Sequence, residues 1–88
     1  MNTMSAVEFD LLDELYFITA FKGLPQAIGQ SDAITRETLC SLLRKEFVWQ
    51  FYFDTEANDF VRTNPIDLDH PGQYHYLASK KGLLAHNI

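Results

Sequence analysis

The stretch LPQAIGQSDAITRETLCSLLRKEFV, residues 24–48, decides the fold of this chain. Pro25 suits the first turn of a short helix that runs through Gln30, because the N–H that proline lacks is not needed there. A turn over residues 31–33 follows, and Thr35 is then expected to be the N-cap of a longer helix. The stretch therefore predicts two helices joined by a tight turn.

The longer helix of this pair is amphipathic. Its apolar stripe consists of Leu39, Leu42, Leu43 and Phe47. Ile34 precedes the expected cap and Leu39 stands at the fourth helical position, so the two are expected to pack as a hydrophobic staple. The polar side chains are expected to point outward and are those of Arg36, Glu37, Ser41, Arg44 and Lys45.

Upstream, residues 7–21 show the 3.6-residue period of a helix, which Gly23 is placed to end. One apolar face of this helix carries Val7, Leu11, Leu15 and Ile18. Phe9, Tyr16 and Phe17 fall on the far side, where one small core cannot also cover them. We expect either the C-terminal segment or a second subunit to cover these aromatic side chains.

From residue 49 the period changes to two, which is typical of a strand buried on one side. The side expected to be buried carries Trp49, Phe51 and Phe53, and the other side carries Gln50, Tyr52 and Asp54. A turn over residues 55–59 leads to a strand over 60–63, a loop over 64–72 and a short strand over 74–77. Ser79 is predicted to cap a last helix that carries Leu83, Leu84 and Ile88.

This order of helix, short helix, helix and hairpin resembles the winged helix-turn-helix family of bacterial transcription regulators. The resemblance is carried by YLASKKG at residues 76–82 and by Gly29, Ala33, Ile34, Thr35, Thr38, Leu39 and Leu43. The family implies a close helix crossing at Gly29, a turn at Ala33 and a buried side chain at Ile34. It also implies an α+β fold of three helices, a small antiparallel β-hairpin or sheet and a short C-terminal helix.

In this family the third helix lies in the DNA major groove, where its first turns read base edges. Carried over here, the resemblance implies that Thr35, Arg36, Glu37 and Ser41 lie near bases of double-stranded DNA, and that Arg44 and Lys45 lie near phosphates. The alternative is that these residues are only the solvated face of an amphipathic helix. Transcription regulation is an expectation from the family alone.

The charge distribution opposes strong DNA binding. The chain carries 7 Lys and Arg against 12 Asp and Glu, for a formal net charge of −5. The expected wing, residues 54–72, holds five acidic side chains and one arginine, although DNA affinity comes largely from cations that neutralise phosphates. The rival hypothesis is therefore a protein-interaction or homodimerisation module without DNA binding, with Phe9, Tyr16 and Phe17 as its contact residues.

The remaining sequence features predict one folded domain over residues 1–88 that is not an enzyme and holds no metal or cofactor. At 88 residues and 47% hydrophobic content, the chain fits one domain. Cys40 is the only cysteine, and the three histidines show no ligand spacing beyond the weak cluster DLDH at residues 67–70. Because no secretory signal or apolar span is present, we expect a cytoplasmic protein that is not in a membrane.

Overall fold

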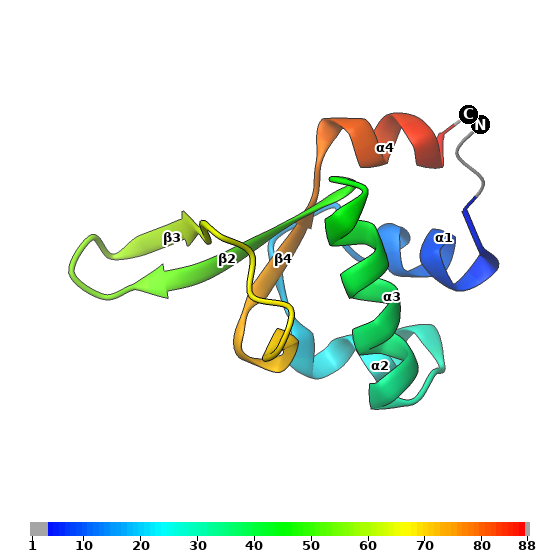
Figure 1. The fold of residues 1–88 in the computed structure, drawn as a ribbon, viewed down its shortest axis with the longest axis horizontal. Helices are drawn as coiled ribbons and strands as arrows, with labels where there is room; N and C mark the ends of the chain where they lie inside the picture. Colours follow the sequence, from blue (N-terminus) through cyan, green and yellow to red (C-terminus); the bar gives the residue numbers. More distant parts are fainter. Residues whose placement is uncertain (1–3, 88) are drawn as a thin grey trace.

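The computed structural model describes residues 4–87 as an α+β fold (Figure 1). The helices are α1 (Ala6–Asp13), α2 (Leu24–Ile28), α3 (Asp32–Arg44) and α4 (Lys80–His86), with 3₁₀ turns η1 (Phe21–Gly23) and η2 (Pro71–Gln73). The strands are β1 (Thr19–Ala20), β2 (Val48–Asp54), β3 (Asp59–Arg62) and β4 (His75–Ala78), which form one antiparallel sheet in the order β1-β4-β2-β3. Ile88, expected on the last helix, lies outside the described residues.

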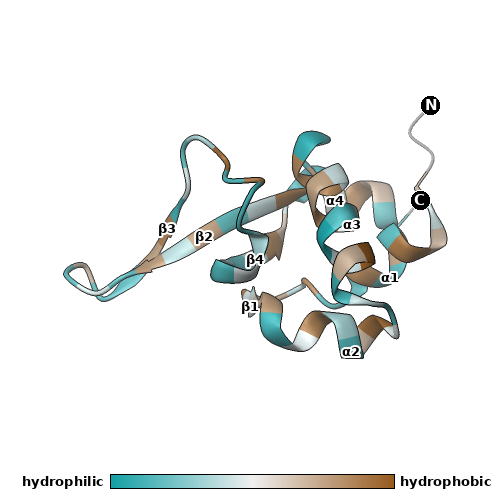
Figure 2. Cartoon of the chain, turned by 60° about the horizontal axis from the view of Figure 1, so that its bottom comes forward, coloured by the Kyte–Doolittle hydropathy of each residue, from teal (hydrophilic) through white to brown (hydrophobic). Residues whose placement is uncertain are grey.

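The helices gather at one end of the molecule, and the hairpin of β2 and β3 projects from the other end (Figure 1). Brown and teal bands alternate along the helices in Figure 2, as expected of elements that bury one side. The fully buried apolar side chains include Leu11, Leu12, Leu15, Leu39, Leu42 and Tyr76. The core therefore lies between α1, α3 and one face of the sheet. Within residues 4–87, every helix is too short or too polar to cross a membrane.

The first helix is shorter than its sequence period predicts. Ser5 begins α1 through a capping box with Glu8, and the helix ends at Asp13 instead of continuing to Phe21. Thr19 and Ala20 leave the helical path and pair with Tyr76 and His75 of β4. The prediction was wrong beyond Asp13 because aromatic and β-branched residues favour extended backbone when a partner strand is present.

The pair of helices α2 and α3 is confirmed, but its cap is not the predicted one. Ser31 is the N-cap of α3, and its side chain accepts a hydrogen bond from the N–H of Ile34 at 3.1 Å. Thr35 lies inside the helix, fully buried, where its hydroxyl donates to the Ser31 carbonyl at 2.8 Å. Ser31 is the better cap because Asp32 then falls in the first turn, at the positive end of the helix dipole.

Three further expectations at this corner are corrected. Ala33 lies within α3 and not in the turn, and Ile34 is 44% exposed and not buried. Gly29 ends α2 with a φ of 67°, and a Cβ added there would have no atom within 4 Å. Gly29 therefore supplies a left-handed backbone at a helix end and does not serve a close helix crossing.

Strand β2 forms where the sequence predicts it, but with the opposite face buried. Val48 and Gln50 are 1% and 2% exposed, whereas Phe53 is 46% exposed. The prediction that the face of Trp49, Phe51 and Phe53 enters the core was wrong. An alternating pattern shows that a strand has two unlike faces, but packing decides which of them meets the helices.

The last part of the chain follows the predicted order closely. Strands β3 and β4 begin and end one residue away from the predicted strands. Ser79 is the N-cap of α4, as predicted, and its hydroxyl accepts from the N–H of Gly82 at 3.0 Å. The helix α4 then turns back toward α1, and this brings the two ends of the described chain together (Figure 1).

Candidate interaction surfaces

The six residues predicted to contact DNA lie on α3 or, for Lys45, at its C-cap, and they fall into three groups. Thr35 is buried and bonded to its own helix. Ser41 and Lys45 are turned toward α1 and contact it. Arg36, Glu37 and Arg44 are exposed. Three of the six side chains are therefore exposed to solvent, and one of these three, Glu37, is acidic.

Glu8 of α1 holds the two residues of the second group. Its Oε2 atom accepts hydrogen bonds from Lys45 Nζ at 2.8 Å and from Ser41 Oγ at 3.1 Å, and the residue is only 7% exposed. Burial by itself would raise the pKa of Glu8, but the hydrogen bonds from Lys45, the Ser5 amide and Ser41 outweigh it and hold the pKa below its usual 4.5. The charge of Lys45 is thus paired with a carboxylate of the same chain.

Arg36 is also partly engaged within the chain. Its guanidinium lies 4.0 Å from the Asp32 carboxylate, one turn away on the exposed helix, and 5.7 Å from the centre of the Phe21 ring. An exposed pair at this spacing contributes little to stability, so Arg36 remains free to move. With Glu37 and Arg44, the exposed charges of α3 are two acidic and two basic.

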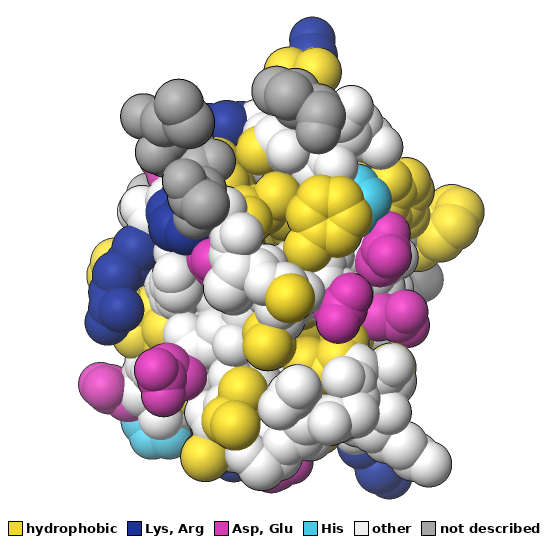
Figure 3. All heavy atoms as spheres, turned by 90° about the vertical axis from the view of Figure 1, so that its right-hand side faces the viewer, with side chains coloured by type: hydrophobic (Ala, Val, Ile, Leu, Met, Phe, Trp, Pro, Cys, Tyr) yellow, Lys and Arg dark blue, Asp and Glu magenta, His cyan; other side chains and the backbone are white. Residues whose placement is uncertain are grey.

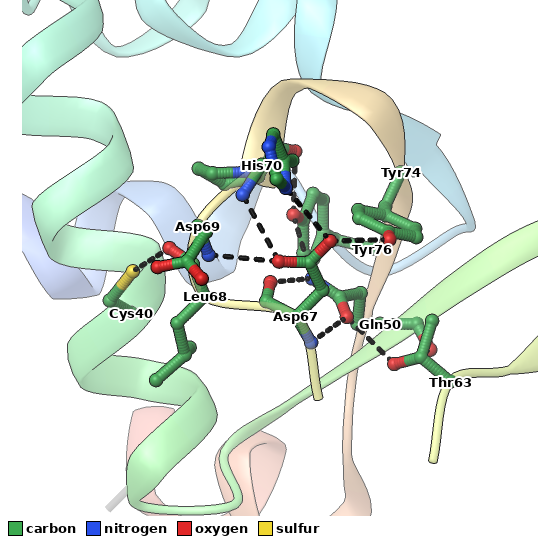
Figure 4. Close-up of polar contacts among 10 residues, drawn as sticks. Cys40, Gln50, Thr63, Asp67, Leu68, Asp69, His70, Tyr74 and Tyr76 are labelled. Atoms are coloured by element: carbon green, nitrogen blue, oxygen red, sulfur yellow. Dashed lines mark hydrogen bonds and ion pairs between the residues drawn. The ribbon is translucent and has the colours of Figure 1, made fainter. Parts of the chain in front are cut away.

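A buried polar network fixes the loop between β3 and β4 (Figure 4). At its centre, Gln50 Nε2 donates to the Asp67 carbonyl at 2.8 Å, and Gln50 Oε1 accepts from the Asp67 N–H at 2.9 Å. Thr63 donates to Gln50 Oε1 at 2.7 Å, and Gln50 Nε2 also donates to the Tyr76 hydroxyl at 3.3 Å. The Gln50 side chain thus pairs with the loop as a neighbouring strand would. Sequence reasoning missed this role because it placed Gln50 on the solvent side.

The DLDH segment is a tight turn held by Asp67. The Asp67 carboxylate accepts from the Tyr74 hydroxyl at 2.7 Å and from the N–H groups of Asp69 and His70 at 2.9 and 3.2 Å. The hydrogen bond from Tyr74 is the main reason that the pKa of Asp67 lies below its usual value. On the α3 side, the Cys40 thiol contacts the Leu68 carbonyl at 3.7 Å. Nowhere in residues 4–87 do three His, Cys, Asp or Glu side chains gather as a metal site would require.

The three aromatic residues predicted as interface contacts form a second surface, which we call the α1 aromatic surface: Phe9, Tyr16 and Phe17. Only Phe9 is on α1, since Tyr16 and Phe17 follow its end. Phe9 stacks on His86 of α4 with ring centres 4.1 Å apart, and the Tyr16 hydroxyl lies 3.3 Å from His86 Nδ1. The C-terminal helix therefore covers part of this surface, which is one of the two covers that the sequence left open.

Much of the α1 aromatic surface stays open even with α4 in place. Phe9, Tyr16 and Phe17 are 39%, 46% and 83% exposed. Asp13 Oδ1 lies 2.8 Å from His86 Nε2, but the two atoms do not form a hydrogen bond. Figure 3 shows hydrophobic and acidic side chains side by side on this end of the molecule.

Comparison of this chain with protein-family profiles, with curated proteins and with solved structures found no match. Its function is therefore argued from the surfaces themselves.

Proposed function

We propose that this chain is a winged-helix protein-interaction module that pairs with a second copy of itself through the α1 aromatic surface and does not act by reading DNA. The order α1, α2, α3, hairpin and α4 supports the winged-helix part of the proposal. The observation that carries the interaction part is the exposure of Phe17, at 83%, on the α1 aromatic surface. The capture of Lys45 and Ser41 by Glu8 argues against DNA reading. Two of the six residues expected to contact DNA are therefore bound to Glu8, and α3 is joined to α1.

The charges around the two surfaces support the same choice. A DNA-binding hairpin would bring cations to the phosphates, but the tip of this one carries Asp54, Glu56 and Asp59. Acidic side chains lie on α1 and lysines lie at the start of α4, and these two helices contact each other: Asp10, Asp13, Lys80 and Lys81. In a twofold dimer, each copy supplies both signs of charge to the other.

The test of this proposal is the oligomeric state of the purified chain. By sedimentation velocity over about 10 to 500 µM, we expect reversible dimers, a range typical of weak association. Phe17→Ser should weaken dimerisation about tenfold, because Phe17 is the most exposed aromatic of the surface. Leu84→Ser, at a side chain 60% exposed on α4, is the matched control and should leave dimerisation unchanged. A monomer at every concentration, or equal effects of both variants, contradicts the proposal.

DNA binding is the second candidate function, because Arg36 and Arg44 remain exposed on α3. It is tested by fluorescence anisotropy of labelled duplex DNA at rising salt, with Arg36→Ala and Arg44→Ala alongside. Under the main proposal, no salt-dependent binding appears at protein concentrations of about 10 to 50 µM. Salt-dependent binding that both substitutions weaken would replace the main proposal with a DNA-associated regulator.

A further inference from the structure

The face of the sheet opposite the helices is lined with aromatic side chains. Because Val48 and Gln50 enter the core, strand alternation puts the next residues of β2 on the other face. The strand register then adds neighbours from β3 and β4, since Phe51 lies beside Arg62 and His75, and Phe53 lies beside Phe60. We call this the outer sheet face: Trp49, Phe51, Phe53, Phe60, Arg62 and His75.

The rings at the hairpin end of the outer sheet face pack on one another. Phe53 and Phe60 meet edge to face with centres 5.2 Å apart, and Phe60 and His75 are 4.8 Å apart. Phe53 is still 46% exposed, and the hairpin that carries it projects beyond the helices (Figure 1). The Arg62 guanidinium lies 4.3 Å from the centre of the Trp49 ring. This face therefore already accepts one cation of its own chain over an aromatic ring.

Acidic side chains lie at one end of the outer sheet face, and the β3 edge of the described sheet has no partner strand. In the described sheet, β3 pairs with β2 on one side and with no strand on the other. The tip of the hairpin carries Asp54, Glu56 and Asp59, and no basic residue lies between residues 54 and 61. An open strand edge offers main-chain hydrogen bonds to another chain, and carboxylates beside aromatic rings favour a cationic one.

We propose that the outer sheet face and the β3 edge bind an extended segment of a partner protein in which Lys or Arg alternates with apolar residues. The backbone of that segment pairs with β3, and its side chains on one face contact the rings of Phe53 and Phe60. Because its residues alternate, its cations lie on the other face of the segment, where they meet the carboxylates of the hairpin tip. This site lies on elements separate from the α1 aromatic surface, so it does not depend on the proposed dimer.

The test uses the full chain and three synthetic peptides of eight residues. The first alternates Arg with Val, the second replaces Arg by Glu, and the third replaces Val by Gly. Trp49 is the only tryptophan of the chain and lies on the outer sheet face, so its fluorescence reports binding directly. We expect the Arg-Val peptide to bind saturably with a Kd of about 10 to 100 µM. The other two should bind at least about tenfold more weakly.

Neighbouring residues of β2 provide matched variants. Phe53 and Tyr52 are 46% and 42% exposed but lie on opposite faces of the strand. Phe53→Ala should weaken binding of the Arg-Val peptide about tenfold, whereas Tyr52→Ala should leave it unchanged. Glu56→Gln, at an exposed side chain of the hairpin tip, should weaken binding about two- to threefold.

Three results would overturn this proposal. Absence of saturable binding removes the site, and equal binding of the Arg-Gly peptide means that charge alone attracts it. A change of Trp49 emission with protein concentration, without peptide, means that a second copy occupies the face. The dimer is tested at Phe17 by sedimentation, and peptide binding is tested at Phe53 by fluorescence. Either proposal can therefore fail while the other is still tested.

Discussion

Gly82 shows how one residue positions a whole helix. A Cβ added there would lie 2.9 Å from the carbonyl carbon of Phe47 and 3.0 Å from its Cα, closer than side chains pack against backbone. The same turn is held by the Ser79 hydroxyl, which donates to the Glu46 carbonyl at 2.6 Å. The start of α4 therefore lies directly on the backbone at the start of β2, and a side chain at residue 82 would separate the two.

We expect Gly82→Ala to lower the free energy of unfolding by about 2 to 4 kcal/mol, because the backbone of Phe47 must move to make room. Alanine would otherwise favour a helix by about 1 kcal/mol, so a loss cannot come from helix propensity. Urea unfolding followed by circular dichroism measures the change. Gly23→Ala, where an added Cβ has no atom within 4 Å, is the control and should stay within about 0.5 kcal/mol. Equal losses would contradict the packing argument.

Among the elements, side-chain contacts join α1 and the residues after it to two other helices. Glu8 ties the start of α1 to the end of α3, and His86 ties α4 to Phe9 and Tyr16. Both contacts connect residues far apart in the sequence, 37 positions in the case of Glu8 and Lys45. The contact of Glu8 was not predicted, because an acidic residue in the first turn of a helix already has a local explanation in the helix dipole. Cover of Phe9 and Tyr16 by the C-terminal segment was one of the two alternatives that the sequence left open.

Glu8→Gln should destabilise the chain by about 1 to 2 kcal/mol at pH 7, because the Lys45 ammonium, on a side chain that is 32% exposed, then loses its charged partner. The folded pKa of Glu8 is below its ordinary 4.5, so its contribution is complete above that pH and is lost as the pH falls through the folded pKa. The difference between wild type and variant should therefore shrink below pH 4.5. Urea unfolding at several pH values measures it. Glu37→Gln, at an exposed side chain of α3, is the control and should stay within about 0.5 kcal/mol of wild type. A difference for Glu8→Gln that stays constant across the pH range would refute the argument.

At the scale of the whole molecule, the sheet, α3 and the loop after β3 are held together around Gln50 and Tyr76. The Tyr76 hydroxyl is buried, donates to the Pro71 carbonyl at 2.6 Å and accepts from Gln50. Burial raises the pKa of Tyr76 to about 12. Since a domain of this size unfolds as one unit, ionisation of this single hydroxyl is coupled to the stability of the entire chain.

Stability should fall between pH 10 and about 12, because the unfolded chain loses the Tyr76 proton at its ordinary pKa while the folded chain retains it. The pKa of Tyr74 is raised as well, by its hydrogen bond to Asp67, and acts in the same direction. Thermal unfolding with tyrosinate absorbance measures the decline. Tyr76→Phe should flatten it while lowering stability at neutral pH, whereas Tyr52→Phe, 42% exposed, should leave it unchanged. An unchanged decline in Tyr76→Phe would show that another group titrates.

Much of the order of the elements could be predicted because it depends on neighbouring residues. Pro25 and Ser79 begin helices through local backbone and side-chain preferences, and the period of two identifies β2 wherever the strand packs. The candidate contact residues of α3 were only partly predictable. Helical spacing showed that Arg36, Ser41 and Lys45 share the polar side, but not which of them another helix would engage.

Residues within a few positions of one another account for the α+β class, the pair α2 and α3, the hairpin and the cap of α4, so these features could be predicted from the chain alone. The tertiary structure alone decided the end of α1, the buried face of β2 and the engagement of Lys45 by Glu8. Each of these depends on a partner distant in the chain: β4 for Thr19, the loop after β3 for Gln50, and α1 for Lys45. Local periodicity contains no information about such partners. The long-range contacts decide which side chains stay exposed, and so they decide where the two proposed surfaces lie.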